Sequence, residues 1–296
     1  MGPLKGALSL VLYSVATVVT FTLLLPLALL KFLVPPWRAA IGRRADALAS
    51  AWIDFSNFHQ RQITGTELQI EGDLSSLSRE QWYLLICNHQ SWVDILILIR
   101  LFNGRIPYVK FFFKKQLLWV PLFGLALWVL DFPMMRRHSR TQLKRNPGLR
   151  EQDMEQTRRA CQVYRYNPVT VVTFPEGTRF RPAKHKAQGE VYRHLLRPHA
   201  GGMAFSLSAM EGRLRKMVDV TINYPDGVPS FWDYSCGRVR RVQLRVVQRT
   251  LTEDLLGDYQ HDREFRMHFQ SWVNDIWREK DAWLDSMRER EQGRES

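Results

Sequence analysis

The sequence has little cysteine and lacks several catalytic motifs. Only three cysteines occur in 296 residues, at Cys87, Cys161 and Cys236, and no Cys-x-x-Cys pair is present. This excludes a disulfide framework, argues against a zinc knuckle and favours a reducing compartment. No Gly-x-Ser-x-Gly occurs, which argues against a serine hydrolase. Internal repeats and low-complexity tracts are also missing.

Acidic residues are outnumbered by basic ones. The chain holds 42 Lys+Arg and 29 Asp+Glu, a formal net charge of +13. A surface this basic favours an anionic partner: nucleic acid, anionic lipid or a phosphorylated substrate. Hydrophobic residues at 45% and charged residues at 24% are typical of globular proteins and exclude a disordered or collagen-like chain. The length fits one domain of about 200–250 residues with an appendage, or two small domains.

A long segment without charge covers residues 8–30. A helix of this length is about 34 Å long, enough to cross a hydrocarbon core of about 30 Å. A cleaved signal peptide has a shorter apolar core and a small-residue cleavage site, whereas Lys31, Pro35 and Pro36 follow this run. We therefore expect a retained membrane anchor, which either spans the bilayer or lies in one leaflet. Basic residues follow it, which predicts that the bulk of the chain lies on the cytoplasmic face, at the inner membrane in a bacterium.

Two further segments have the spacing of amphipathic helices. Residues 37–62 carry apolar side chains at steps of three and four beside basic ones. That pattern is typical of a helix at a membrane interface and equally of a helix that packs against a domain. Residues 261–296 contain a C-terminal amphipathic helix, whose aromatic face we expect to pack against the domain.

Strand and helix patterns alternate between these segments. Short apolar or β-branched runs at 83–87, 169–174, 218–223 and 242–248 predict strands, and helical patterns lie at 91–102 and 153–165. This order predicts an α/β fold with a mixed, partly parallel sheet flanked by helices. We therefore divide the chain into an N-terminal anchor and interfacial helix (1–62), an α/β domain (63–260) and a C-terminal helix (261–296). Ligands of such sheets bind at the carboxyl ends of strands.

The first polar motif directly follows the 83–87 strand. It reads Asn-His-Gln-Ser-Trp-Val-Asp over residues 88–94 and places His89 ahead of Asp94. In one regular helix the two side chains would lie about 140° apart, so they meet only if His89 precedes the helix and Asp94 lies in its first turn. The alternative is structural, because Ser91 and Asp94 have the spacing of a capping box.

The second polar motif directly follows the 169–174 strand. It reads Phe-Pro-Glu-Gly-Thr-Arg over residues 174–179. A Pro-Gly turn offers backbone N–H groups, and Thr178 and Arg179 add a hydroxyl and a guanidinium, which together suit a phosphate. A surface turn with an exposed arginine is the structural alternative.

Together the two motifs resemble the first and third conserved blocks of the glycerolipid acyltransferases, the family of 1-acylglycerol-3-phosphate acyltransferase. The resemblance extends over about residues 68–225, and it looks closest to the lysocardiolipin and lysophospholipid acyltransferase branch. It implies that His89 and Asp94 are catalytic. The acceptor phosphate-binding block falls on Glu176, Gly177, Thr178 and Arg179.

Two further blocks of this family fall on less typical residues. The arginine of the second block corresponds to Arg136 or Arg137, of which we prefer Arg137. The fourth, apolar-proline block lies near residues 220–225, where an Asn-Tyr insertion precedes the proline. Lys114 and Lys115 are candidates for binding the phosphates of the acyl donor, or are surface residues. The apolar segment 117–130 is too short to span a bilayer and predicts a core helix or a wall of an acyl-chain groove.

The resemblance implies a membrane-bound O-acyltransferase. It would transfer a fatty acyl chain from acyl-CoA or acyl carrier protein to the hydroxyl of 1-acyl-sn-glycerol 3-phosphate, giving phosphatidic acid. Independently of the family, a neutral histidine with a pKa near ~6.5 suits removal of a hydroxyl proton, and a carboxylate holds its tautomer. We expect no metal and no cofactor besides the acyl-CoA or acyl-ACP co-substrate. The expected partners are the lysophospholipid, the donor and an anionic membrane surface, with no nucleic acid.

Three alternatives remain open. The acceptor could be another lysophospholipid, of the lysophosphatidylglycerol or lysocardiolipin type. A basic, membrane-associated nucleic-acid-binding protein would also explain the charge, although no recognition motif supports it. Finally, Cys87 lies two residues before His89, on the same face of an extended strand, so a Cys–His pair could form an acyl-enzyme. Against this, a cysteine that ends a buried apolar strand is more often a small core residue.

Overall fold

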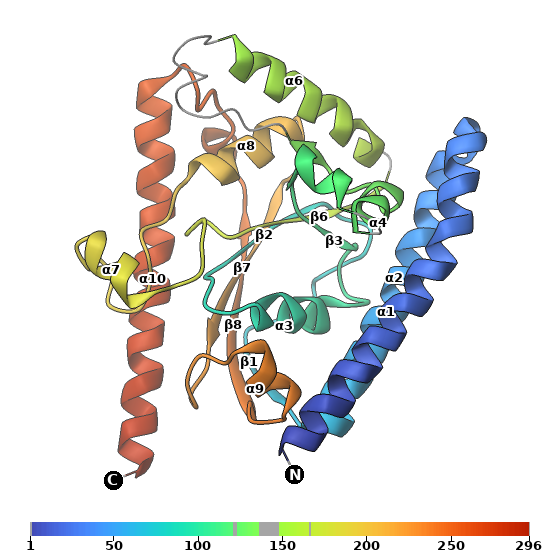
Figure 1. The fold of residues 1–296 in the computed structure, drawn as a ribbon. Coiled ribbons are helices and arrows are strands. Elements are labelled where there is room, and N and C mark those ends of the chain that lie inside the picture. The colour runs from blue at the N-terminus through green and yellow to red at the C-terminus, as the bar shows by residue number, and fades with distance from the viewer. Residues whose placement is uncertain (1, 121–122, 136–147, 166, 296) are drawn as a thin grey trace.

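The computed structural model describes residues 2–120, 123–135, 148–165 and 167–295 (Figure 1). A six-stranded mixed sheet forms its centre, in the order β1-β8-β7-β2-β6-β3. β7 and β8 are antiparallel, and the other four pairings in this sheet are parallel. The strands are β1 (Glu67–Glu71), β2 (Tyr83–Cys87), β3 (Val109–Lys110), β6 (Thr170–Thr173), β7 (Lys216–Asn223) and β8 (Arg241–Thr250). A separate parallel pair joins β4 (Phe113–Lys114) to β5 (Met134–Met135).

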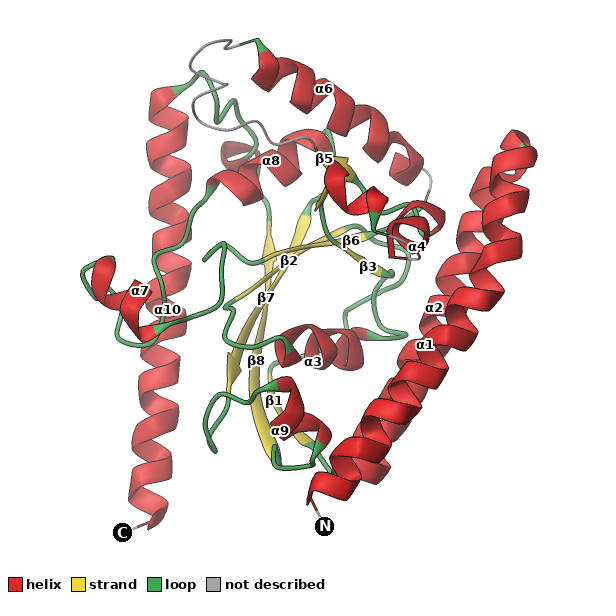
Figure 2. Cartoon of the chain, in the orientation of Figure 1, coloured by secondary structure: helices red, strands yellow, loops and turns green. Residues whose placement is uncertain are grey.

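Helices cover both faces of the central sheet (Figure 2). One face packs against α6 (Leu149–Cys161), α8 (Gly201–Ala209) and the long α10 (Arg263–Glu295). The other face packs against α3 (Val93–Phe102) and α9 (Phe231–Ser235). Every residue of β2 is buried, because alternate side chains of a central strand point into one core and then the other. The predicted mixed α/β sheet flanked by helices is therefore confirmed.

The N-terminal helices α1 (Gly2–Leu33) and α2 (Arg38–His59) lie side by side along one flank of the domain (Figure 1). Among the described residues, α1 is the one helix long and apolar enough to cross a membrane. Most of its apolar side chains are exposed. A narrow stripe of α1 nevertheless contacts the rest of the protein near both ends of the helix. Near its start, the Ser9 hydroxyl donates to the carbonyl of Ser235 in α9. Near its end, Lys31 Nζ lies 2.7 Å from Asp131 Oδ1.

α2 buries its inner face against the protein. The buried residues are Ile41, Ala45, Ala49 and Ile53, so this face packs against the domain as one of the two interpretations of residues 37–62 requires. Phe58, near the end of the helix, is exposed. The apolar segment 117–130 contains α4 (Phe123–Val129), with Leu127 and Val129 buried, as a packing helix requires. The remaining short elements are η1 (Pro35–Trp37), η2 (Gln60–Thr64), η3 (Lys115–Trp119), η4 (Gln162–Arg165), α7 (Pro182–Ala187) and η5 (Glu253–Leu255).

Several element boundaries differ from those predicted. The helix expected from residue 91 begins at Val93, because residues 88–92 form the turn that carries the first motif. The helix expected at 153–165 starts earlier, at Leu149, and becomes a 3-10 turn after Cys161. Strands β1 and β3 were not predicted from the sequence.

Candidate active site

The turn after β2 brings His89 and Asp94 together. Asn88 anchors this turn to β7: its side-chain amide donates to the Ile222 carbonyl at 3.0 Å, and its Oδ1 accepts the Ile222 N–H at 2.8 Å. His89 therefore lies before α3, and Asp94 is in the first helical turn. His89 Nδ1 and Asp94 Oδ2 are 2.8 Å apart. The two residues meet in the one arrangement that the spacing permits.

Asp94 also caps the turn. Its Oδ2 accepts the backbone N–H groups of Gln90 at 2.6 Å and Ser91 at 2.9 Å. Ser91 does not complete a capping box, because its hydroxyl donates to the Pro229 carbonyl at 2.6 Å and accepts the Val93 N–H. One carboxylate thus serves both the helix start and the imidazole.

The pairing orients the imidazole of His89. Since an ionised carboxylate only accepts hydrogen bonds, we assign the proton to Nδ1 and leave the lone pair on Nε2. Asp94 is fully buried, whereas the His89 side chain is 13% exposed. The ring stacks on Phe174, with centroids 4.2 Å apart. Nε2 is consequently the nitrogen able to take a proton from a ligand.

The second motif packs directly against the first. β6 ends at Thr173, and Gly177 adopts a left-handed conformation with φ 67°, which favours glycine in the turn. The Phe180 N–H donates to the His89 carbonyl at 2.7 Å. β2 and β6 are neighbouring parallel strands, so both turns emerge at the same edge of the sheet.

Glu176 joins the two motifs through its carboxylate. Oε1 accepts the His89 N–H at 3.2 Å, and Oε2 accepts the Leu196 N–H at 3.3 Å. The residue is only 1% exposed. Its carboxylate therefore faces inward, and this differs from the direct phosphate contact expected from the sequence. A buried acid that accepts two backbone N–H groups holds the loops in place.

Arg179 remains available to an anion. Its Cζ lies 4.8 Å from the centroid of the Trp92 ring, and Trp92 is 58% exposed. Within the described part of the chain, no carboxylate pairs with this guanidinium. Because Trp92 belongs to the turn that carries His89, the stacking places a free guanidinium beside the candidate base.

A tyrosine that sequence reasoning did not assign also contacts the site. The Tyr224 hydroxyl donates to Asp94 Oδ1 at 2.7 Å. The residue directly follows β7, which ends at Asn223. The signal in the sequence was the Asn-Tyr insertion before Pro225.

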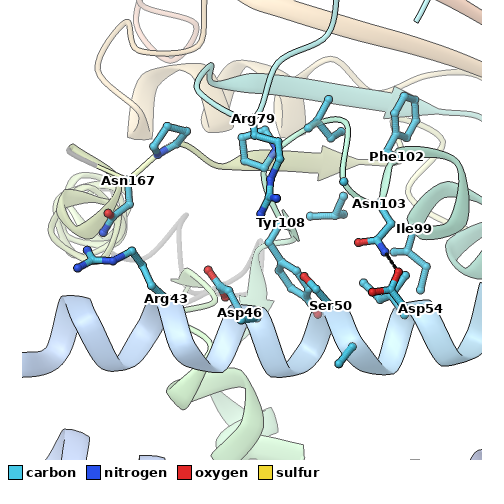
Figure 3. Close-up of a pocket in the computed structure, with 18 residues that line it drawn as sticks. Arg43, Asp46, Ser50, Asp54, Arg79, Ile99, Phe102, Asn103, Tyr108 and Asn167 are labelled. Atoms are coloured by element: carbon cyan, nitrogen blue, oxygen red, sulfur yellow. Dashed lines mark hydrogen bonds between the residues drawn. The ribbon is translucent and has the colours of Figure 1, made fainter.

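A cavity of about 610 Å³ opens elsewhere in the molecule (Figure 3). It lies between α2 and the C-terminal end of α3, where Asn103 donates to Asp54 at 2.6 Å. Its other polar lining includes Arg43, Asp46 and Arg79. None of its lining residues belongs to either motif, so this cavity is distinct from the His89 site.

Comparisons with known proteins settle the family. The model of the family described as "Acyltransferase" matches residues 68–224, more than half of the chain. The chain belongs to the acyltransferase family. The matched region contains both motifs.

The curated relatives of this acyltransferase-family chain are distant. Mouse 1-acyl-sn-glycerol-3-phosphate acyltransferase epsilon is 24% identical over 264 residues, covering 81% of this chain and 66% of the relative. Probable 1-acyl-sn-glycerol-3-phosphate acyltransferase 5 of Arabidopsis thaliana is 26% identical over 218 residues, 67% of this chain and 54% of the relative. The human gamma enzyme of the same name is 25% identical, over 73% and 57% of the two chains. The chain thus spans about half to two thirds of these relatives.

A solved structure also resembles this acyltransferase-family fold. The 1-acyl-sn-glycerophosphate acyltransferase PlsC of Thermotoga maritima matches with a TM-score of 0.48 and 15% identity. The match covers 95% of this chain and 98% of that one.

The two candidate arginines of the second block lie outside the described residues, whereas the two candidate donor-binding lysines lie in described elements. Arg136 and Arg137 lie among residues 136–147, outside the described residues. Lys114 ends β4 and Lys115 begins η3. In the described parts of the chain, no group of three or more His, Cys, Asp or Glu side chains is placed to hold a metal.

Cys87 is a core residue of this acyltransferase-family domain. It is fully buried in the apolar cluster below α3. Burial raises the pKa of the Cys87 thiol well above its ordinary value, which disfavours the thiolate. This geometry argues against the acyl-enzyme alternative.

Replacing Glu176 with glutamine is expected to flatten the pH dependence of stability. Burial raises the pKa of Glu176 from 4.5 to about 8, while its two backbone donors oppose the shift. Between these pH values the folded state retains a proton that the unfolded state has lost, so stability falls as pH rises. The slope from this one group is about 1.4 kcal/mol per pH unit. Thermal unfolding of both proteins between pH 5 and pH 8 measures the difference.

Glu80→Gln provides the matched control, because Glu80 is exposed. Its pH dependence should follow that of the wild type. A Glu176→Gln variant with an unaltered slope would contradict the buried, protonated state of this carboxyl.

Proposed function

We propose that this protein is a membrane-bound acyltransferase acting on 1-acyl-sn-glycerol 3-phosphate. The observation that carries the proposal is the His89–Asp94 hydrogen bond at the edge of the sheet, beside a guanidinium with no carboxylate partner among the described residues. The names of the relatives support the same acceptor. The proposed donor is an acyl thioester of coenzyme A or acyl carrier protein.

The proposed reaction uses His89 as general base. Nε2 takes the proton of the acceptor hydroxyl, and the oxygen attacks the thioester carbonyl. The C–O bond forms, the C–S bond breaks, and the leaving thiolate accepts the proton from the imidazolium. Asp94 stabilises the imidazolium during the step. Because a thiolate is a good leaving group, the reaction needs neither a metal nor a cofactor besides the donor.

Arg179 is proposed to bind the acceptor phosphate. A phosphomonoester carries a charge of about −1.5 to −2, which a planar guanidinium engages through two hydrogen bonds. The exposed Trp92 ring beneath the guanidinium holds it in place. Gly177 and Thr178 supply the turn from which Arg179 extends. Arg137 and the donor-binding roles of Lys114 and Lys115 stay predictions from the sequence.

The contacts of α1 support a position in one leaflet. Its first turns contact α9, and Lys31 near its other end pairs with Asp131 of the domain. A helix tied to one domain at both ends cannot place those ends on opposite sides of a bilayer. We propose that its exposed apolar side enters the cytoplasmic leaflet, with the basic domain on the cytoplasmic surface.

A panel of acceptors tests the proposed function. The purified full chain is given one long-chain acyl-CoA and, separately, lysophosphatidic acid, lysophosphatidylglycerol and lysocardiolipin, with products read by mass spectrometry. Phosphatidic acid as the main product supports the proposal. Preference for another lysolipid would reassign the acceptor. Absence of transfer to all three, together with salt-dependent DNA binding, would replace the proposal with the nucleic-acid alternative.

Arg179→Lys is expected to raise the acceptor KM about tenfold with little change in kcat, because a lysine cannot form the paired hydrogen bonds. Steady-state kinetics with varied lysophosphatidic acid measures this effect. Arg181→Lys is the control, since Arg181 is exposed two residues away. An unchanged acceptor KM in Arg179→Lys would remove Arg179 from the phosphate site.

A further inference from the structure

Tyr224 completes the hydrogen bonding of the Asp94 carboxylate. The two carboxylate oxygens have different partners. Oδ2 accepts from the His89 ring and from the N–H groups of Gln90 and Ser91. In the part of the chain that the structure describes, Tyr224 is the one donor to Oδ1. The phenol is buried with the carboxylate, so water does not replace this bond readily.

We propose that Tyr224 is a positioning residue, which acts on His89 through Asp94. Its hydroxyl fixes the carboxylate and disperses part of its negative charge, and so sets how strongly the imidazole retains a proton. The inference rests on the proposed function, because it assumes that His89 is the base. It also gives a role to Tyr224 as part of the Asn-Tyr insertion before Pro225, in the fourth block of the family.

The hydrogen bond has a defined electrostatic effect. Burial raises the pKa of Tyr224 well above its ordinary value, so the phenol keeps its proton and stays a donor. A donor to a carboxylate stabilises and disperses its charge. Without the donor, the charge on Asp94 is less dispersed and attracts an imidazolium more strongly. The protonated form of His89 then persists to higher pH.

Other titratable groups near this pair stay in place when Tyr224 is altered. They come from β2, from the turn after β6, from β7, from α9 and from α10. These groups are Cys87, Glu176, Arg179, Tyr234, Asp219 and Lys280. Since all of them are common to the wild type and Tyr224→Phe, a difference between these two titrations reports the Tyr224 bond.

Tyr234→Phe is a closely matched control for Tyr224→Phe. Tyr234 is fully buried in the same apolar cluster as Tyr224. Its hydroxyl has no hydrogen-bond partner among the described residues. Both substitutions remove one buried hydroxyl, but only one of them removes a donor from Asp94.

The experiment follows His89 in the full chain in detergent micelles. Its imidazole NMR signal is assigned by its absence from His89→Gln and titrated without substrate; the pH profile of kcat/KM is recorded in parallel. In Tyr224→Phe we expect the titration midpoint and the acidic limb to move up by about half a pH unit or more, and kcat to fall about tenfold. Tyr234→Phe should leave both unmoved.

A second variant keeps the test decisive if Tyr224→Phe does not fold. 3,5-Difluorotyrosine at position 224 retains the hydroxyl and is a stronger donor, so it should move the titration midpoint downward. Unmoved titrations in the folded variants, or equal shifts in Tyr224→Phe and Tyr234→Phe, would overturn the inference. Because the NMR titration needs no substrate, it gives its answer even if the acceptor panel refutes the proposed function.

Discussion

Acyl transfer by the His89→Ala variant is expected to fall by about 10²–10⁴-fold or below detection, because the general base is lost. The fold should persist. The backbone bonds of residue 89 to Glu176 and Phe180 do not involve the imidazole and remain in the variant. The substitution removes the stacking contact of the ring with Phe174. Initial rates with acyl-CoA and lysophosphatidic acid measure the loss, and thermal unfolding checks the fold.

His261→Ala is the matched control for this substitution. His261 Nδ1 lies 2.8 Å from Asp258 Oδ2, which is the same pair of atoms at the same distance as in the His89 pair. That second pair is exposed and belongs to neither motif. Its loss should leave transfer near the wild-type rate. Near-normal transfer by purified His89→Ala would refute the assignment of the base.

Local sequence was sufficient for the central strand and for the relative position of His89 and Asp94. Five consecutive apolar residues predict β2 at 83–87, and the structure places it there. Because two side chains at this spacing in one helix would point apart, His89 had to lie before the helix, and the helix begins at Val93. What the sequence left open was whether Asp94 caps the helix or holds the imidazole. A carboxylate has several acceptor sites, so both are satisfied at once.

Long-range contacts explain what the sequence did not predict. Glu176 lies in a Pro-Gly turn, where a carboxylate is usually exposed. Its burial depends on N–H groups of His89 and Leu196, which are remote in the chain. The role of Tyr224 was not predicted, because its contact with Asp94 arises only when β7 places the end of a distant strand beside the turn after β2. β3 was missed because an edge strand of two residues carries no periodic signal. β1 was missed although its five residues alternate polar and apolar side chains.

Asp94→Asn is expected to separate charge from geometry at the site. The oxygen of the new side-chain amide can still accept the three donors that now contact Oδ2, and the amide NH₂ can donate to the Tyr224 hydroxyl, whose own proton rotates away. The turn should therefore persist, with thermal stability close to the wild type. The charge that stabilises the imidazolium is lost, so kcat should fall by about 10²–10⁴-fold.

The pH profile and a second variant test the charge argument. Because a neutral amide attracts the imidazolium less than a carboxylate, the acidic limb of kcat/KM in Asp94→Asn should move to lower pH, opposite to the shift expected for Tyr224→Phe. Asp94→Ala leaves the N–H groups of Gln90 and Ser91 without their acceptor, at about 1–3 kcal/mol for the buried Ser91 group and less for the half-buried Gln90 group. It should therefore lose stability as well as activity. If Asp94→Asn were as unstable as Asp94→Ala, the carboxylate would matter mainly for the helix start; if Asp94→Asn were fully active, its charge would have no part in the acyl transfer.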